Sequence, residues 1–246
     1  DLDTRAFGRV CDTDFGAFAT DDADDRLDYF GQFGHQIDET HEWGGMVVGT
    51  DQPDFGNTIA ALRASGRETS GLNYALEAAF TRTNGADGNG RYLSGEVGWA
   101  EDHWSAGVTY DEYARDFFPA NGIVDGDLLD TRGATVAAGY YRDFGAGPLY
   151  NIQADLYWQR RDVMDGDLQG DLQKDYIGAS GSIELRNEIR LTLGYAGGDY
   201  RPVVGGPGEW ATTLNKDSYW TAGVEFNTRN DRLSYGVFVS DGRIAD

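Results

Sequence analysis

Alternation of apolar and polar residues over segments of about ten residues is the feature that most limits what this chain can fold into. Alternate side chains of an extended strand point to opposite sides. The stretch 150–159 divides in this way: Tyr150, Ile152, Ala154, Leu156 and Trp158 fall on one side, and Asn151, Gln153, Asp155, Tyr157 and Gln159 on the other. A tilted strand of about ten residues is long enough to cross a bilayer. The pattern therefore predicts strands with one oily and one wet side.

We expect fourteen such strands, of which the first five are less regular. They are 7–11, 14–20, 27–36, 43–50, 57–64, 72–81, 91–100, 104–111, 131–143, 151–159, 176–185, 189–196, 218–227 and 232–240. The 35 glycines suit many tight turns, and the 5 prolines leave most strands uninterrupted. An all-β fold follows.

The connections between these strands alternate in length from residue 91 onward. Short links are expected at 101–102, 144–147, 187–188 and 229–231, and long loops at 112–130, 161–174 and 197–217. Outer-membrane barrels alternate short periplasmic turns with longer external loops. The sequence predicts one domain, residues 1–246, folded as an antiparallel up-and-down transmembrane β-barrel of about 14 strands, either alone or as part of a larger barrel. The rival interpretation is a soluble, salt-adapted β-sandwich, whose apolar faces would be buried against a second sheet.

Composition narrows the class of protein further. The apolar runs are too short for a membrane-spanning helix, and the mean hydropathy of -0.53 fits strands that show lipid only every second residue. Acidic residues number 42 against 20 basic, a net charge of -22, which argues against nucleic acid as a partner. The charge fits either acidic, solvent-exposed loops or a cation-attracting lumen. We expect a Gram-negative outer-membrane protein in contact with lipid.

The start of the chain carries two smaller signals. Cys11 is the single cysteine, so no intramolecular disulfide supports the fold. The chain begins at Asp1 and has no visible signal peptide, so we expect a processed or partial chain.

Aromatic residues near the predicted strand ends resemble a membrane-interface girdle. The candidates are Trp99, Trp104, Tyr110, Tyr150, Trp158 and Trp220. Ordinary packing of strand-favouring aromatics would give a similar distribution.

Charged residues on the predicted inward side are candidates for lining a lumen. They are Glu77, Glu96, Asp111, Asp155, Glu184 and Glu225, with Arg82, Arg186 and Arg190 among them. In a water-filled channel their acidic excess would favour cations. In a lumen filled by side chains the same groups would be structural ion pairs, and the sequence leaves both outcomes open.

Sites for chemistry are weakly indicated. His35, His41 and His103 have no spacing typical of a metal site or a catalytic triad, and no nucleophile elbow or phosphate-binding loop is present. We therefore expect no enzyme activity and no cofactor. The nearest approach to a calcium site is the odd-offset set Asp165, Asp167 and Asp171, which lacks the glutamate that an EF-hand loop requires.

Several segments resemble a known family. Residues Arg115 to Val124 are similar to its Asp-Phe-Asn-Pro-Glu-Val-Gly-Phe-Val stretch, and 15–20, 45–50, 198–200 and 236–241 fall in a similar order. In this bacterial family, a domain resembling family 9 carbohydrate-binding modules precedes an outer-membrane barrel of unknown function. The family's preceding domain and its terminal aromatic strand have no counterpart in these 246 residues, so the resemblance leaves open whether they close a barrel alone or with further strands.

The resemblance and the alternation together leave two main functions open. The first is a porin-like conduit or transport-associated channel, with any link to carbohydrate coming from the resemblance alone. The second is a non-conducting barrel whose long loops dock an envelope protein complex or a glycan. An outer-membrane hydrolase is a weaker third hypothesis, because no acid, base and nucleophile converge in the sequence.

Overall fold

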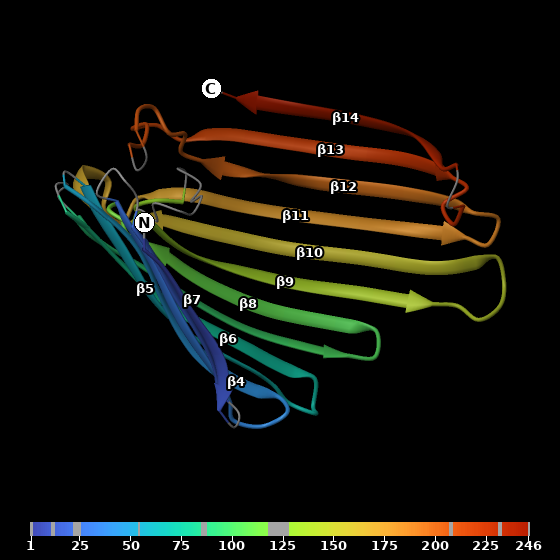
Figure 1. Ribbon diagram of the computed structural model, residues 1–246. Helices are drawn as coiled ribbons and strands as arrows, with labels where there is room; N and C mark the ends of the chain where they lie inside the picture. The colour runs from blue at the N-terminus through green and yellow to red at the C-terminus, as the bar shows by residue number, and fades with distance from the viewer. Residues whose placement is uncertain are drawn as a thin grey trace.

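Fourteen strands form one antiparallel sheet in chain order, from β1 to β14, within the residues that the structure describes (Figure 1). The computed structural model describes residues 2–10, 13–21, 26–53, 55–84, 88–117, 128–206, 209–230 and 233–245. The strands are β1 (Leu2–Val10), β2 (Thr13–Asp21), β3 (Leu27–Gln36), β4 (His41–Gln52), β5 (Phe55–Arg67), β6 (Leu72–Asn84), β7 (Gly88–Glu101), β8 (Trp104–Tyr113), β9 (Thr131–Asp143), β10 (Leu149–Val163), β11 (Leu172–Leu185), β12 (Ile189–Tyr200), β13 (Asn215–Phe226) and β14 (Tyr235–Ala245). Each of the fourteen predicted segments overlaps one of them. The predicted all-β, up-and-down fold is confirmed.

Helical structure is confined, in the described ranges, to one 3-10 turn, η1 (Gly166–Leu168). No helix there has the length and apolarity to cross a membrane. Cys11 and residues 118–124 of the family-like segment lie outside the described residues.

The connections divide the sheet into two ends, which we call the turn end and the loop end. From β7 onward the turn end carries 102–103, 144–148, 186–188 and 227–234, and the loop end carries 114–130, 164–171 and 201–214. Each loop-end connection is longer than the turn-end connections beside it, as predicted. The turn predicted at 229–231 spans 227–234, however, and is as long as the loop-end connection 164–171. The loop predicted at 161–174 is shorter than expected, because β10 and β11 extend into it. Left-handed residues make several turns, including Asp102 (φ 49°) and Glu188 (φ 66°).

The two faces of the sheet differ sharply in chemistry. Register pairs such as Trp104 with Tyr140 and Leu156 with Ala179 place apolar side chains of neighbouring strands on one face. We call this the apolar face and the opposite one the polar face. Exposed residues of the apolar face include Leu62, Leu72, Leu76, Phe80, Val97, Val108, Val136, Leu156, Ile177, Leu191, Leu193 and Val237. Because one sheet is present in the described residues and its apolar face is uncovered, the sandwich interpretation is wrong.

The apolar run along a strand is as long as a tilted transmembrane strand requires. On β9, Arg132 and Arg142 bound a run in which Ala134, Val136, Ala138 and Tyr140 point to this face. These two arginines lie ten residues apart, which is about 33 Å along a strand at ~3.3 Å per residue. A strand tilt of about 40° reduces this length to roughly 25 Å, the height of the apolar band of a transmembrane barrel.

The sheet curves into an open trough, and its two edges do not meet (Figure 1). In the described residues β1 pairs with β2 alone and β14 with β13 alone. Closure into a barrel stays a prediction. Bilayers do not tolerate the unpaired backbone groups of such an edge.

Replacing Leu156, which is 51% exposed on the apolar face, by arginine tests whether that face contacts lipid. In vesicles, Leu156→Arg should lower the free energy of unfolding by about 2–4 kcal/mol, the cost of a cation at the bilayer midplane. On a water-exposed surface the same change would stay within about 0.5 kcal/mol. Urea titration of the vesicle-inserted protein measures the difference. Gln153→Arg, on the polar face of the same strand, is the matched control and should have little effect.

Candidate functional site

The polar face brings together most of the charged residues that were candidates for a lumen. Alternation along each strand and register between strands place seven of them on this face: Glu77, Glu96, Asp111, Asp155, Glu184, Arg190 and Glu225. They form three groups, one at the turn end, one at the loop end and one between.

Two predicted lumen residues lie elsewhere. Arg82 pairs with Thr58 and Asn89 and alternates in phase with Phe80, so it lies on the apolar face and its predicted inward position is wrong. Arg186 lies in the turn after β11, where its Nε donates to the Gly147 carbonyl at 2.8 Å and its Nη2 to the Phe144 carbonyl. Arg186 therefore holds the 144–148 turn and does not line the face.

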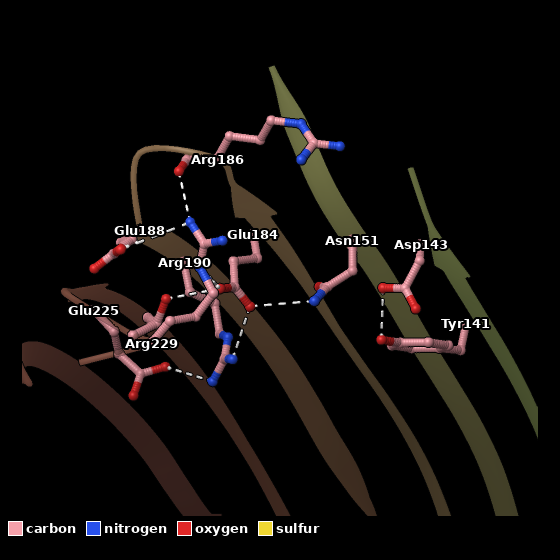
Figure 2. Close-up of polar contacts among 10 residues, drawn as sticks. Tyr141, Asp143, Asn151, Glu184, Arg186, Glu188, Arg190, Glu225 and Arg229 are labelled. Carbon is pink, nitrogen blue, oxygen red and sulfur yellow. Dashed lines mark hydrogen bonds and ion pairs between the residues drawn. The ribbon is translucent and has the colours of Figure 1, made fainter. Parts of the chain in front are cut away.

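Glu184 is the centre of the turn-end group, which we call the Glu184 cluster (Figure 2). Its side chain is 1% exposed, and its contacts come from β10, β12 and the β13–β14 connection. Arg190 Nη2 and Asn151 Nδ2 donate to Oε2 at 2.9 and 3.2 Å. Thr228 Oγ1 donates to Oε1 at 2.8 Å, and Arg229 Nε lies 3.6 Å from that oxygen. Both oxygens of the buried carboxylate are therefore satisfied.

Arg229 links the β13–β14 connection to this cluster. Its Nη2 donates to the Arg186 carbonyl at 2.6 Å, and its guanidinium lies 4.5 Å from the ring centre of Tyr150. The register shifts between Leu149 and Asn151, which removes Tyr150 from the alternation of β10. The predicted place of Tyr150 on the oily face is therefore wrong, because its ring packs against the arginine of an ion-pair cluster.

The charges of the Glu184 cluster nearly cancel. Arg190 also lies 3.5 Å from Glu225, and Arg229 lies 3.9 Å from Glu188 (Figure 2). Three carboxylates thus face two guanidinium groups, with Arg186 close by. This arrangement fixes β10 to β13 relative to one another and leaves little free negative charge at the turn end.

Removing the Glu184 charge should destabilise the sheet strongly. Glu184→Gln leaves Arg190 and Arg229 without their buried partner, and breaking a buried ion pair costs about 3–5 kcal/mol. Glu188→Gln removes a 39% exposed carboxylate from the same arginine and should cost less than about 1 kcal/mol. Urea unfolding in vesicles compares the two, and equal losses would contradict a central role for Glu184.

Arg161 is the centre of the loop-end group. Its side chain is 3% exposed, and Nη2 lies 2.5 Å from Asp111 Oδ1. Nε and Nη2 donate to Thr131 Oγ1 at 3.1 and 2.9 Å. Thr131 Oγ1 in turn donates to the Leu128 carbonyl at 2.6 Å. The buried arginine thus ties β8, β9 and β10 to the end of the β8–β9 connection.

The β8–β9 connection folds back over the polar face. Phe117 and Leu129, both 6% exposed, pack with Ile59, Ala61 and Ala79 in the hydrophobic cluster of the sheet. A side chain at Gly90 would come within 2.2 Å of the Asp116 and Phe117 backbone, so glycine permits this close approach. The described parts of the connection therefore cover the loop end of the polar face.

Asp130 holds the end of the same connection through hydrogen bonds, and the pKa of its carboxyl group is raised. It is 1% exposed, and it adopts left-handed φ of 61°. Its Oδ1 accepts from the Asp165 amide at 3.1 Å, and its carbonyl accepts from the Met164 amide at 2.9 Å. Burial, with the negative charge of Asp165, raises the pKa of Asp130 to about 6.

Docking of the connection should therefore weaken as the pH rises through about 6. The Asp130 carboxyl ionises near 3.8 when freely solvated and near 6 when docked, so docking is most favourable below the lower value and loses up to about 3 kcal/mol above the higher one. Hydrogen-exchange protection of the Met164 amide measures this.

Asp130→Asn stays neutral and should keep at pH 8 the protection that the wild type shows at pH 5. Asp167→Asn, an exposed change on the neighbouring connection, is the control and should retain the wild-type pH dependence. Identical pH profiles for the wild type and Asp130→Asn would exclude this role for Asp130.

The middle of the polar face carries exposed carboxylates that form no ion pair among the described residues. Glu77, Glu96 and Asp155 are exposed. Asp155 accepts from Gln153 Nε2 at 2.9 Å. Glu77 and Glu96 have no ion pair with the part of the chain that the structure describes. This middle group therefore adds exposed negative charge to the face, with Arg63 opposite Glu77 in the β5–β6 register.

Five of the six predicted interface aromatics lie exposed on the apolar face: Trp99, Trp104, Tyr110, Trp158 and Trp220. Trp158 Nε1 donates to Asp175 at 2.7 Å, and the Tyr110 hydroxyl donates to Glu112 at 3.4 Å. Each of these two side chains therefore has its ring on the apolar face and its polar atom bonded to a carboxylate at the edge of that face. Trp220 lies near the middle of its strand, because β13 begins three residues earlier than predicted.

The candidate calcium ligands do not converge. The Asp165 amide caps Asp130, Asp171 lies 3.3 Å from Arg201 Nη2, and Asp167 sits exposed in η1. Over the described ranges, no three His, Cys, Asp or Glu side chains form a group that could hold a metal ion.

Comparison with known protein families and with curated proteins finds no match. Function is therefore inferred from the geometry of the sheet and its two faces.

Proposed function

We propose that this protein is a bacterial outer-membrane β-barrel whose polar face lines a water-filled conduit for small cations. The observation that carries the proposal is the reversed amphipathicity of the sheet. Its apolar side chains are exposed, whereas charged groups such as Glu184 and Arg161 are buried on the opposite face. Lipid satisfies such an apolar face, and water with ion pairs satisfies the polar one.

Strand dimensions support the membrane assignment. Most strands are 12 to 15 residues long, as in β4 and β10, which exceeds the ~9–11 residues that a tilted transmembrane strand requires. The additional residues carry the strands beyond the apolar band, where charged side chains begin.

The distribution of charge on the polar face supports cation transport. The Glu184 cluster and the Arg161 network are internally compensated. Glu77 and Glu96 between them are exposed and form no ion pair among the described residues. Fixed carboxylates in a narrow aqueous path favour cations and disfavour anions.

A non-conducting barrel that docks a protein or a glycan through its loops is the second candidate. The fold of the β8–β9 connection over the polar face favours it, because Phe117 and Leu129 occupy space that a wide channel would leave open. The two candidates differ in whether ions pass.

Conductance in a planar bilayer separates the candidates. The protein is folded into detergent micelles, added to the bilayer and recorded at the single-channel level. Stepwise conductance with cation preference supports the conduit. Stable insertion without conductance favours the docking barrel, and full solubility without detergent would refute both.

Glu77→Gln combined with Glu96→Gln should reduce cation preference without abolishing conductance. A carboxylate about 7 Å from a passing cation in water contributes ~0.6 kcal/mol, a factor of roughly three for each charge. The reversal potential in a salt gradient measures this change. Glu101→Gln removes an exposed carboxylate from the apolar face of β7 and should leave the reversal potential unchanged. A wild-type value for the double variant would exclude Glu77 and Glu96 from the ion path.

A further inference from the structure

Charged residues bound the apolar face at its loop end on eight consecutive strands, β6 to β13. Each is the first charged residue beyond the apolar run of its strand. The loop-end rim comprises Arg82, Arg91, Glu112, Arg132, Arg160, Asp175, Asp199 and Lys216.

The arginines of this rim are grouped on one side. Arg82, Arg91, Arg132 and Arg160 come from β6, β7, β9 and β10, and we call them the arginine arc. All four are exposed. In a protein with a net charge of -22 and 20 basic residues in total, such a grouping reverses the prevailing charge locally.

The arginine arc is only partly neutralised by neighbouring carboxylates. Arg91 Nη2 lies 2.6 Å from Glu112, and Arg160 Nε lies 3.6 Å from Asp162. Arg82 and Arg132 make no ion pair with any residue that the structure describes. Two guanidinium groups at the edge of an apolar surface thus retain donors for an external anion.

We propose that the arginine arc binds the phosphate groups of anionic membrane lipids in the leaflet at the loop end. This inference rests on the proposed membrane function, because the arc adjoins lipid only if the apolar face does. Guanidinium groups bind phosphate oxygens bidentately. Directly below the arc, Tyr110 and Trp158 lie where aromatic rings meet the headgroup boundary. Acyl chains on the apolar face would therefore place their phosphates at the height of the arc.

Charge complementarity also predicts where these lipids do not gather. On β11 and β12 the rim carries Asp175 and Asp199, a register pair of like charge. Anionic headgroups would be repelled there. Bound lipid should therefore concentrate along β6 to β10.

Lipid selectivity of the inserted protein tests the arc. The wild type, an Arg82→Gln/Arg132→Gln variant and an Arg63→Gln control are each folded into phosphatidylcholine bilayers. Arg63 is 65% exposed on the polar face, so its loss removes a comparable charge far from lipid. Spin-labelled phosphatidic acid and spin-labelled phosphatidylcholine then report the relative association of each lipid with the protein surface. Tryptophan emission and heat-dependent gel mobility independently report insertion.

The wild type and Arg63→Gln should prefer phosphatidic acid, and the double variant should lose about five-fold in preference for each missing cation. Salt at 1 M should reduce the wild-type preference. Full insertion with equal preference in all three proteins, or an equal loss in Arg63→Gln, would overturn the arginine arc and leave the proposed function standing. Failure of the wild type to insert into any bilayer would overturn the proposed function, and the arc with it.

Discussion

Pairing of every backbone group with a neighbouring strand is the constraint on which the rest of this structure depends. The face presented by β6 to β13 is apolar and exposed, and in the membrane setting that we propose, lipid offers no partner for a free amide or carbonyl. The long antiparallel ladders meet that demand for all but the two edge strands. The side chains are then free to divide by chemistry, with alternate residues on the apolar or the polar face.

The polar face shows how charged side chains are arranged on the side of the sheet opposite the apolar face. Glu184 and Arg161 are both nearly inaccessible, and each is surrounded by groups from three or more elements. Such clusters are stable when every donor and acceptor is satisfied and costly when one is lost. Glu77 and Glu96, which lie between these clusters, are not enclosed in this way. The enclosed groups hold the sheet together, whereas the exposed ones could act on an ion.

Local pattern predicted strand positions, faces and connection lengths, because each depends on residues close together in the chain. Alternation predicts that Glu184 and Glu225 share one face. It did not predict the partners, since Thr228 lies 44 residues from Glu184 in sequence. The bulge at Leu149 to Asn151 reversed Tyr150 through a register shift with no local sequence mark. Arg82 shows the opposite case, because its charge favours the polar face whereas its place in the alternation puts it on the apolar face. The sequence carries one feature that predicts the docking of Phe117. The apolar residues Ile59, Ala61 and Ala79 occupy positions on the polar face.

The strand order also determines how such a sheet can assemble. Because each strand pairs with its neighbours in the chain, every new strand extends a hairpin that already exists, and no crossover has to wait for a distant segment. Loop-closure entropy then stays small at each step. Growth can proceed one hairpin at a time from either side, with the last strand added always offering its free edge as the template for the next.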